Sequence, residues 1–130
     1  MPKLRALWWS LGIALLLAIA ALSLLSIRGP DLHLPNSDKL NHALAYCVLT
    51  VYFGQLVGTE WRRRAVVVGS LIVYGIAIEL LQALTPTRVA EVADLVANAA
   101  GIGLGLLLLR TPLSRLLIAI ERRFAHVANL

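Results

Sequence analysis

The sequence has little cysteine and little charge. Its 130 residues include one cysteine, Cys47, which excludes a disulfide framework and a cysteine-based metal site within one chain. Only 15% of the residues are charged, whereas 59% are hydrophobic. A soluble domain of this length needs a larger charged surface to stay dispersed. The shortage of charge therefore excludes an ordinary water-soluble domain.

Several signatures of enzymes are also missing. The sequence contains no HExxH spacing, no nucleophile elbow, no glycine-rich phosphate loop and no dinucleotide-binding fingerprint. One histidine among carboxylates is a poor ligand set for zinc, so we expect no metal and no cofactor. The net charge of +5 does not predict nucleic acid binding, because the basic residues lie between apolar runs, where they set membrane topology.

The apolar residues are concentrated in four long runs. These lie at about 6–27, 40–57, 65–84 and 89–109. A helix rises about 1.5 Å per residue, so each run can cross a hydrocarbon core of about 30 Å. Backbone polar groups in lipid must be satisfied within their own segment, which predicts helices. The first run is too long for a cleaved signal peptide, so we expect it to be retained as an anchor. We predict an all-α integral membrane protein whose four-helix membrane domain covers residues 1–110.

Residues 111–130 have a different pattern. Thr111 followed by Pro112 is typical of a helix start. Beyond them, apolar side chains fall on one helical face and basic side chains fall on the opposite face. We predict a cationic amphipathic helix that lies in the plane of the membrane on its cytoplasmic surface.

Lysine and arginine are distributed unevenly across the four predicted crossings. Nine of them lie on one side, and only Arg28, Lys39 and Arg88 lie on the other. The side richer in these residues is normally cytoplasmic. We therefore expect a multi-pass protein of the bacterial inner membrane with both termini in the cytoplasm. The loops at 28–39 and 84–88 then face outward.

Polar side chains inside the predicted spans gather near the outward ends. Such side chains are costly in lipid, so each requires a reason. Asp38, His42 and Tyr46 are spaced i, i+4, i+8 on one helical face, with Lys39 beside them. The remaining members come from the next two segments and the turn between them: Glu79, Gln82, Arg88, Asp94 and Asn98. Because the topology brings these segments together at their outward ends, we predict that the nine residues contribute to one ligand site.

The fourth segment also carries small residues at a regular spacing. Ala93, Ala97, Gly101 and Gly105 recur every four residues. Small residues allow a neighbouring helix to approach closely. We expect tight helix packing along this stripe, and a homodimer through Gly101 and Gly105 is a further option.

The ordered set of polar residues resembles the VanZ-like family. The motif reads Asp38-Lys39-x-x-His42-x-x-x-Tyr46, then Glu79-x-x-Gln82, then Arg88, then Asp94-x-x-x-Asn98-x-x-Gly101. The resemblance covers roughly residues 37–105, which include three of the four predicted helices. It implies a small bacterial membrane protein of a family whose founding member is associated with tolerance to the glycopeptide teicoplanin. It implies no agreed biochemical activity.

Several functions remain open from the sequence. The favoured hypothesis is binding of an amphiphile with a zwitterionic or phosphate-bearing head group, because cationic and acidic side chains are mixed above an apolar interior. A membrane enzyme would use His42 with Asp38 as a base and its orienter and Glu79 as the acid, although a distinctive nucleophile is missing. A proton-coupled transporter would use Glu79 and Asp94 and would require a dimer. A network that only locks three helices together is the remaining interpretation.

Overall fold

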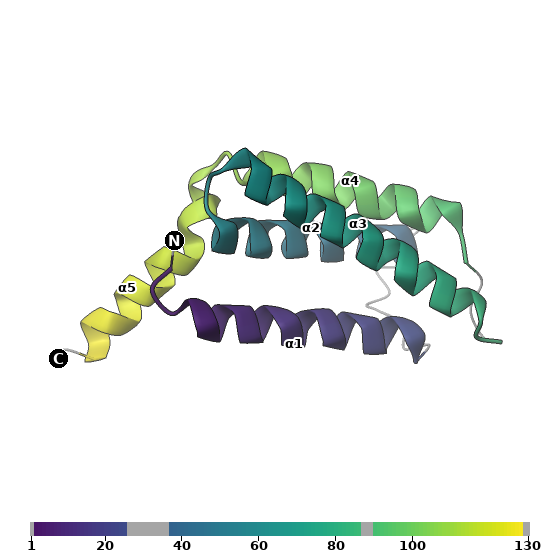
Figure 1. Ribbon diagram of the computed structural model, residues 1–130, viewed down its shortest axis with the longest axis horizontal. Coiled ribbons are helices and arrows are strands. Elements are labelled where there is room, and N and C mark those ends of the chain that lie inside the picture. The colour runs from purple at the N-terminus through teal and green to yellow at the C-terminus, as the bar shows by residue number, and fades with distance from the viewer. Residues whose placement is uncertain (1, 26–36, 87–89, 129–130) are drawn as a thin grey trace.

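The protein is all-helical over the residues that the structure describes. The computed structural model describes residues 2–25, 37–86 and 90–128. They form α1 (Arg5–Leu24), α2 (Ser37–Val57), α3 (Trp61–Ala83), α4 (Val92–Leu108), a short 3-10 helix η1 (Pro112–Arg115) and α5 (Leu116–Ala128). The first four helices lie alongside one another, and α5 runs away from them (Figure 1). Each predicted apolar run is therefore a helix, with ends shifted by a few residues.

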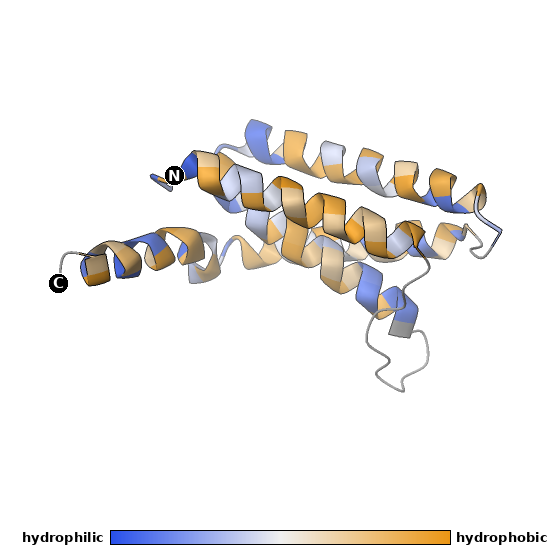
Figure 2. Ribbon diagram, turned by 90° about the horizontal axis from the view of Figure 1, so that it is seen from below, coloured by the Kyte–Doolittle hydropathy of each residue, from blue (hydrophilic) through white to orange (hydrophobic). Residues whose placement is uncertain are grey.

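The length and hydropathy of the helices identify a multi-pass membrane protein. Helix α1, residues Asp38–Val57 of α2 and helix α3 are each long and apolar enough to cross a membrane. Helix α4 has 17 residues, and a bend of 81° separates it from Pro112–Ala128. Hydrophobic residues run along the helices of the bundle (Figure 2). Large apolar side chains among them remain exposed, as at Leu17 and Leu80. Because a soluble protein would bury such residues, this surface suits lipid.

Helices α2 and α4 pack so closely that glycine is required between them. A Cβ atom added at Gly101 would lie 2.1 Å from the carbonyl oxygen of Ala43, and one at Gly105 would lie 2.6 Å from Cβ of Thr50. The predicted close approach at the small residues is thus made to α2 of the same chain. Gly101 and Gly105 are therefore both buried against α2. Ala93 is exposed, and the buried face of α4 includes Asp94, Asn98, Gly101 and Gly105.

Helix α1 is attached mainly by side chains that donate to its backbone carbonyls. Gly12 is the buried residue of this helix. The hydroxyl of Tyr52 donates to the carbonyl of Trp8 (2.7 Å), and that of Tyr74 donates to the carbonyl of Leu16 (2.5 Å). These bonds give both tyrosine hydroxyls a hydrogen-bond acceptor and fix the position of α1 along its axis relative to α2 and α3.

The turn into α5 is fixed by polar contacts. Thr111 caps η1, since its side-chain oxygen accepts from the N–H of Leu113 (3.3 Å), as its position before Pro112 predicts. The buried side-chain oxygen of Gln55 on α2 accepts from the N–H of Leu117 (2.9 Å). The start of α5 is therefore held against the end of α2.

The N-terminus is held by Glu121 of α5. Its carboxylate accepts from the backbone N–H groups of Lys3 (2.7 Å) and Leu4 (2.8 Å) and from the indole N–H of Trp8 (2.6 Å). Desolvation opposes ionisation of this group, but the three donors outweigh it and hold the pKa of Glu121 below its ordinary value. We call these four residues the N-terminal clamp.

Candidate functional site

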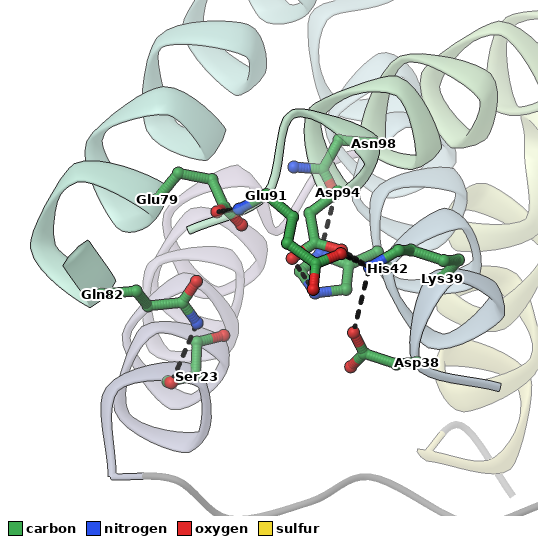
Figure 3. A network of polar contacts seen from close by, with 9 residues as sticks. All are labelled: Ser23, Asp38, Lys39, His42, Glu79, Gln82, Glu91, Asp94 and Asn98. Carbon is green, nitrogen blue, oxygen red and sulfur yellow. Dashed lines mark hydrogen bonds and ion pairs between the residues drawn. The ribbon is translucent and has the colours of Figure 1, made fainter. Parts of the chain in front are cut away.

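Polar side chains from three helix ends meet at one end of the bundle. The start of α2, the end of α3 and the start of α4 lie together there (Figure 3). The contacting residues, called the polar cluster below, are Asp38, Lys39, His42, Glu79, Glu91, Asp94 and Asn98. The cluster contains six of the nine residues that the sequence predicted for one site.

Lys39 is the cation at the centre of the polar cluster. Its Nζ lies 2.5 Å from Oδ1 of Asp94, 2.6 Å from Oε2 of Glu91 and 3.6 Å from Oδ2 of Asp38. Asp94 is only 5% exposed, so its charge needs a partner in the protein. Lys39 therefore neutralises part of the acidic charge and connects α2 to the start of α4.

The ring of His42 is oriented by Asn98. Nδ1 of His42 lies 3.0 Å from Oδ1 of Asn98, and because an amide oxygen only accepts, Nδ1 carries the donated proton. Nε2 then faces Oδ2 of Asp94 at 3.8 Å, which is longer than a hydrogen bond. The sequence had assigned the orienting role to Asp38. Asn98 takes it instead, because it lies on α4, which packs directly against this face of α2.

Glu79 is a buried carboxylate of the polar cluster, and one of its two oxygens accepts no hydrogen bond from the described residues. Its Oε2 accepts from the backbone N–H of Glu91 (3.2 Å), and the residue is 5% exposed. Oε1 is buried and has no hydrogen-bond partner among the described residues. The carboxylate is turned toward Asp94, a second buried acid (Figure 3). A buried carboxylate oxygen without a donor is costly, so this atom is the strongest indication of a ligand site.

Tyr46 and Gln82 lie beside the polar cluster rather than in it. Tyr46 is buried, with its ring 6.2 Å from that of Tyr74, centroid to centroid. Gly75 makes room for it, since an added Cβ would lie 3.0 Å both from the Tyr46 hydroxyl and from Nδ2 of Asn98. Gln82 donates from Nε2 to the carbonyl of Ser23 (3.1 Å) and so attaches α1 to α3.

Arg88, the remaining predicted member of the site, lies outside the described residues.

A comparison with protein families identifies the chain. A family model described as VanZ/LLP1 matches residues 4–117. The chain belongs to the VanZ/LLP1 family. The match confirms the resemblance noted from residues 37–105 and extends it to α1 and to the start of α5. No curated protein and no solved structure matches the chain.

The sequence missed one member of the polar cluster in this VanZ/LLP1 protein. Glu91 accepts from Lys39 and donates its backbone N–H to Glu79, so it connects all three helix ends. It lies within the predicted run 89–109 but was not assigned to the site, and in the structure it precedes Val92, the first residue of α4. The sequence did contain one indication of this role. Glu91 lies three residues before Asp94, and two acids at this spacing lie on the same helical face, where both can contact one lysine.

An apolar cavity lies on the other side of the Tyr46 and Tyr74 pair. It has a volume of about 340 Å³, is open on one side and is lined by residues of α1, α2 and α3. Its lining includes Trp9, Phe53 and Tyr74. Since Tyr74 lines this cavity and also contacts Tyr46, the two tyrosines lie between the apolar cavity and the polar cluster of the VanZ/LLP1 protein.

Proposed function

We propose that the polar cluster binds the head group of an amphiphilic or lipid-linked ligand of the cell envelope. The observation that carries this proposal is Glu79, a buried carboxylate with one unpartnered oxygen beside Asp94. An ammonium or hydroxyl group of a ligand would donate to that oxygen and remove the cost of leaving it unpaired.

The charge balance of the polar cluster favours a zwitterionic head group. The polar cluster contains four carboxylates and one lysine, so its charge favours a positive group near Glu79. A phosphate of the same head group would approach Lys39, together with Arg88 if the outward turn contributes. The apolar cavity is within the size range of ligand pockets and suits hydrocarbon. A phospholipid, a lipid-linked wall precursor and a lipoglycopeptide all have this chemistry.

We further propose that the polar cluster faces the outer leaflet of the bacterial inner membrane. The nine-to-three distribution of lysine and arginine supports cytoplasmic termini, provided that α4 is the fourth span. Its 17 residues extend about 25 Å, which a locally thinned bilayer accommodates. The bend of 81° would then direct the amphipathic α5 along the cytoplasmic surface.

Mass spectrometry of lipids retained by the detergent-purified protein tests the proposal. Glu79→Gln should reduce the retained lipid, while the protein stays folded and monodisperse. The amide suits the fold, because its N–H₂ group can donate toward Asp94 where the wild-type oxygen has no partner. The matched control is Glu60→Gln, the same change on an exposed side chain before α3. Equal lipid retention by both variants would contradict the proposal.

The same measurement separates binding from catalysis. The orientation of His42 by Asn98 would also suit a general base, which makes a membrane enzyme the second candidate. A binding protein should release its lipid chemically unchanged, whereas an enzyme should yield a new product. If the ligand is a lipoglycopeptide, expression of the wild type should raise teicoplanin tolerance, and expression of Glu79→Gln should not.

A further inference from the structure

Three side chains of the polar cluster are arranged as a set of metal ligands. Asp38, His42 and Asp94 each present one ligand atom, and these atoms lie within 4.8 Å of one another. We infer that these three residues bind a divalent transition-metal ion. The sequence predicts no metal, because one histidine among carboxylates is a poor ligand set for zinc. The structure differs in bringing Asp94 of α4 beside Asp38 and His42 of α2.

The geometry of His42 matches that of a metal-binding histidine. A ligating imidazole usually donates its second ring N–H to an oxygen, which fixes the ring and leaves the other nitrogen free. Here Nδ1 donates to Asn98, so the lone pair of Nε2 is directed toward Oδ2 of Asp94 at 3.8 Å. Two ligands bound about 2.1 Å from one ion are separated by about 3–4 Å. The observed distance is thus too long for a hydrogen bond and suitable for two ligands of one ion.

Glu79 provides an independent reason to place a cation here. Its carboxylate is 5% exposed, is turned toward Asp94 and keeps one oxygen without a partner among the described residues. Two buried acids facing each other repel unless a cation compensates them or one of them is protonated. Among the described contacts, Lys39 bonds to Oδ1 of Asp94 and not to Glu79, which leaves Oδ2 of Asp94 available to an ion.

The donor set selects the class of metal. One imidazole with two carboxylates is a mixed set that Zn²⁺ and the harder Mn²⁺ can both accept, whereas Ca²⁺ prefers oxygen ligands alone. Metal binding goes beyond the proposed function, because it does not require a lipid. If both proposals hold, the ion would also supply positive charge for a phosphate head group in a cluster rich in carboxylates.

Titration of the untagged protein with ZnCl₂, after removal of metals with EDTA, tests the inference. The decisive variant is Asp38→Asn, because the side chain of Asp38 is 62% exposed and its loss should leave the fold intact. The control is Glu60→Gln, whose side chain is similarly exposed (52%) but lies in the loop before α3. Calorimetry should give an affinity for Asp38→Asn at least about tenfold weaker than for wild type, with Glu60→Gln unchanged. Equal Zn²⁺ affinities for wild type and Asp38→Asn would overturn the inference, as would no binding to the wild type.

Mn²⁺ provides a second measurement that identifies the histidine. Pulsed electron paramagnetic resonance of the Mn²⁺-loaded wild type should reveal coupling to an imidazole nitrogen, and His42→Gln should abolish it. Nitrogen coupling that persists in His42→Gln would overturn the assignment. Metal binding by lipid-free protein and lipid retention in the presence of EDTA are separate results, so either proposal can fail while the other stands.

Discussion

The contact between α2 and α4 leads to a sharp prediction at Gly101. A single methyl group added there would lie 2.1 Å from the carbonyl oxygen of Ala43, far inside van der Waals contact. The obstacle is backbone, which cannot rotate away, so Gly101→Ala must move α4 off α2. Gly103→Ala is the matched control, because an added Cβ at Gly103 meets nothing within 4 Å.

Gly101→Ala and Gly103→Ala make the same chemical change in α4, and only Gly101→Ala creates a clash with α2. Alanine improves helix propensity by about 1 kcal/mol at either position, and that gain cancels in the comparison. Overpacking typically costs about 1–3 kcal/mol. For about 130 residues, 1 kcal/mol corresponds to roughly 4 °C by the scaling of soluble domains. We therefore expect Gly101→Ala to melt about 4–12 °C below Gly103→Ala.

Cys47 supplies the assay for this comparison. It is the only cysteine of the chain and is buried, at 6% exposure, so a thiol-reactive fluorophore reports unfolding in detergent directly. Neither substitution changes the thiol itself. Equal melting temperatures for Gly101→Ala and Gly103→Ala would show that α2 and α4 are not packed as described, and the reasoning would be refuted.

Three further predictions concern topology, the polar cluster and pH. A cysteine placed at Asn36, with Cys47 replaced, should react with an impermeant reagent in intact spheroplasts; labelling only after permeabilisation would reverse the proposed topology. His42→Ala should abolish lipid retention without unfolding, whereas Tyr46→Phe should retain most of it, and parallel loss of folded protein would point to a structural network. The N-terminal clamp should make the wild type melt at a higher temperature than Glu121→Gln above pH 4.5, the ordinary pKa of the Glu121 carboxyl. This difference should vanish as the pH falls through the lowered pKa of Glu121 in the folded protein. A difference between the two melting temperatures that does not change with pH would contradict the prediction.

The helices could be predicted from the sequence because each apolar run is long and uninterrupted. A run that must satisfy its backbone inside lipid has one structural solution, so α1, α2 and α3 followed from length alone. The bend after α4 was also predictable, since Thr111 and Pro112 carry local signals. The N-terminal clamp was not predictable. It joins Glu121 to residues more than 110 positions away, and no local pattern encodes such a pairing.

The polar cluster was predictable in membership but not in pairing. The predicted topology placed Asp38, His42, Glu79 and Asp94 near one another, because helix ends on the same side of the membrane lie at a similar depth in it. The partner of each group depended on helix rotation, which the sequence leaves open. Thus Asn98 rather than Asp38 orients His42, and Gln82 turns toward α1. Glu91 was missed because its role depends on contacts with Lys39 of α2 and Glu79 of α3, which the sequence does not specify.

Within the polar cluster, α2 and α4 are joined by more contacts than α3 is. A bound ligand would therefore affect α3 most. Helices α2 and α4 are joined by the glycine contacts and by the bonds from Lys39 to Asp94 and from His42 to Asn98. Among the described residues, Glu79 on α3 reaches the cluster through one bond of 3.2 Å, to the backbone of Glu91. A ligand that donates to Oε1 of Glu79 would therefore strengthen the weaker side. Bound ligand should hold the end of α3 against the α2–α4 pair, and amide exchange should slow at that end of α3 more than in α2 or α4.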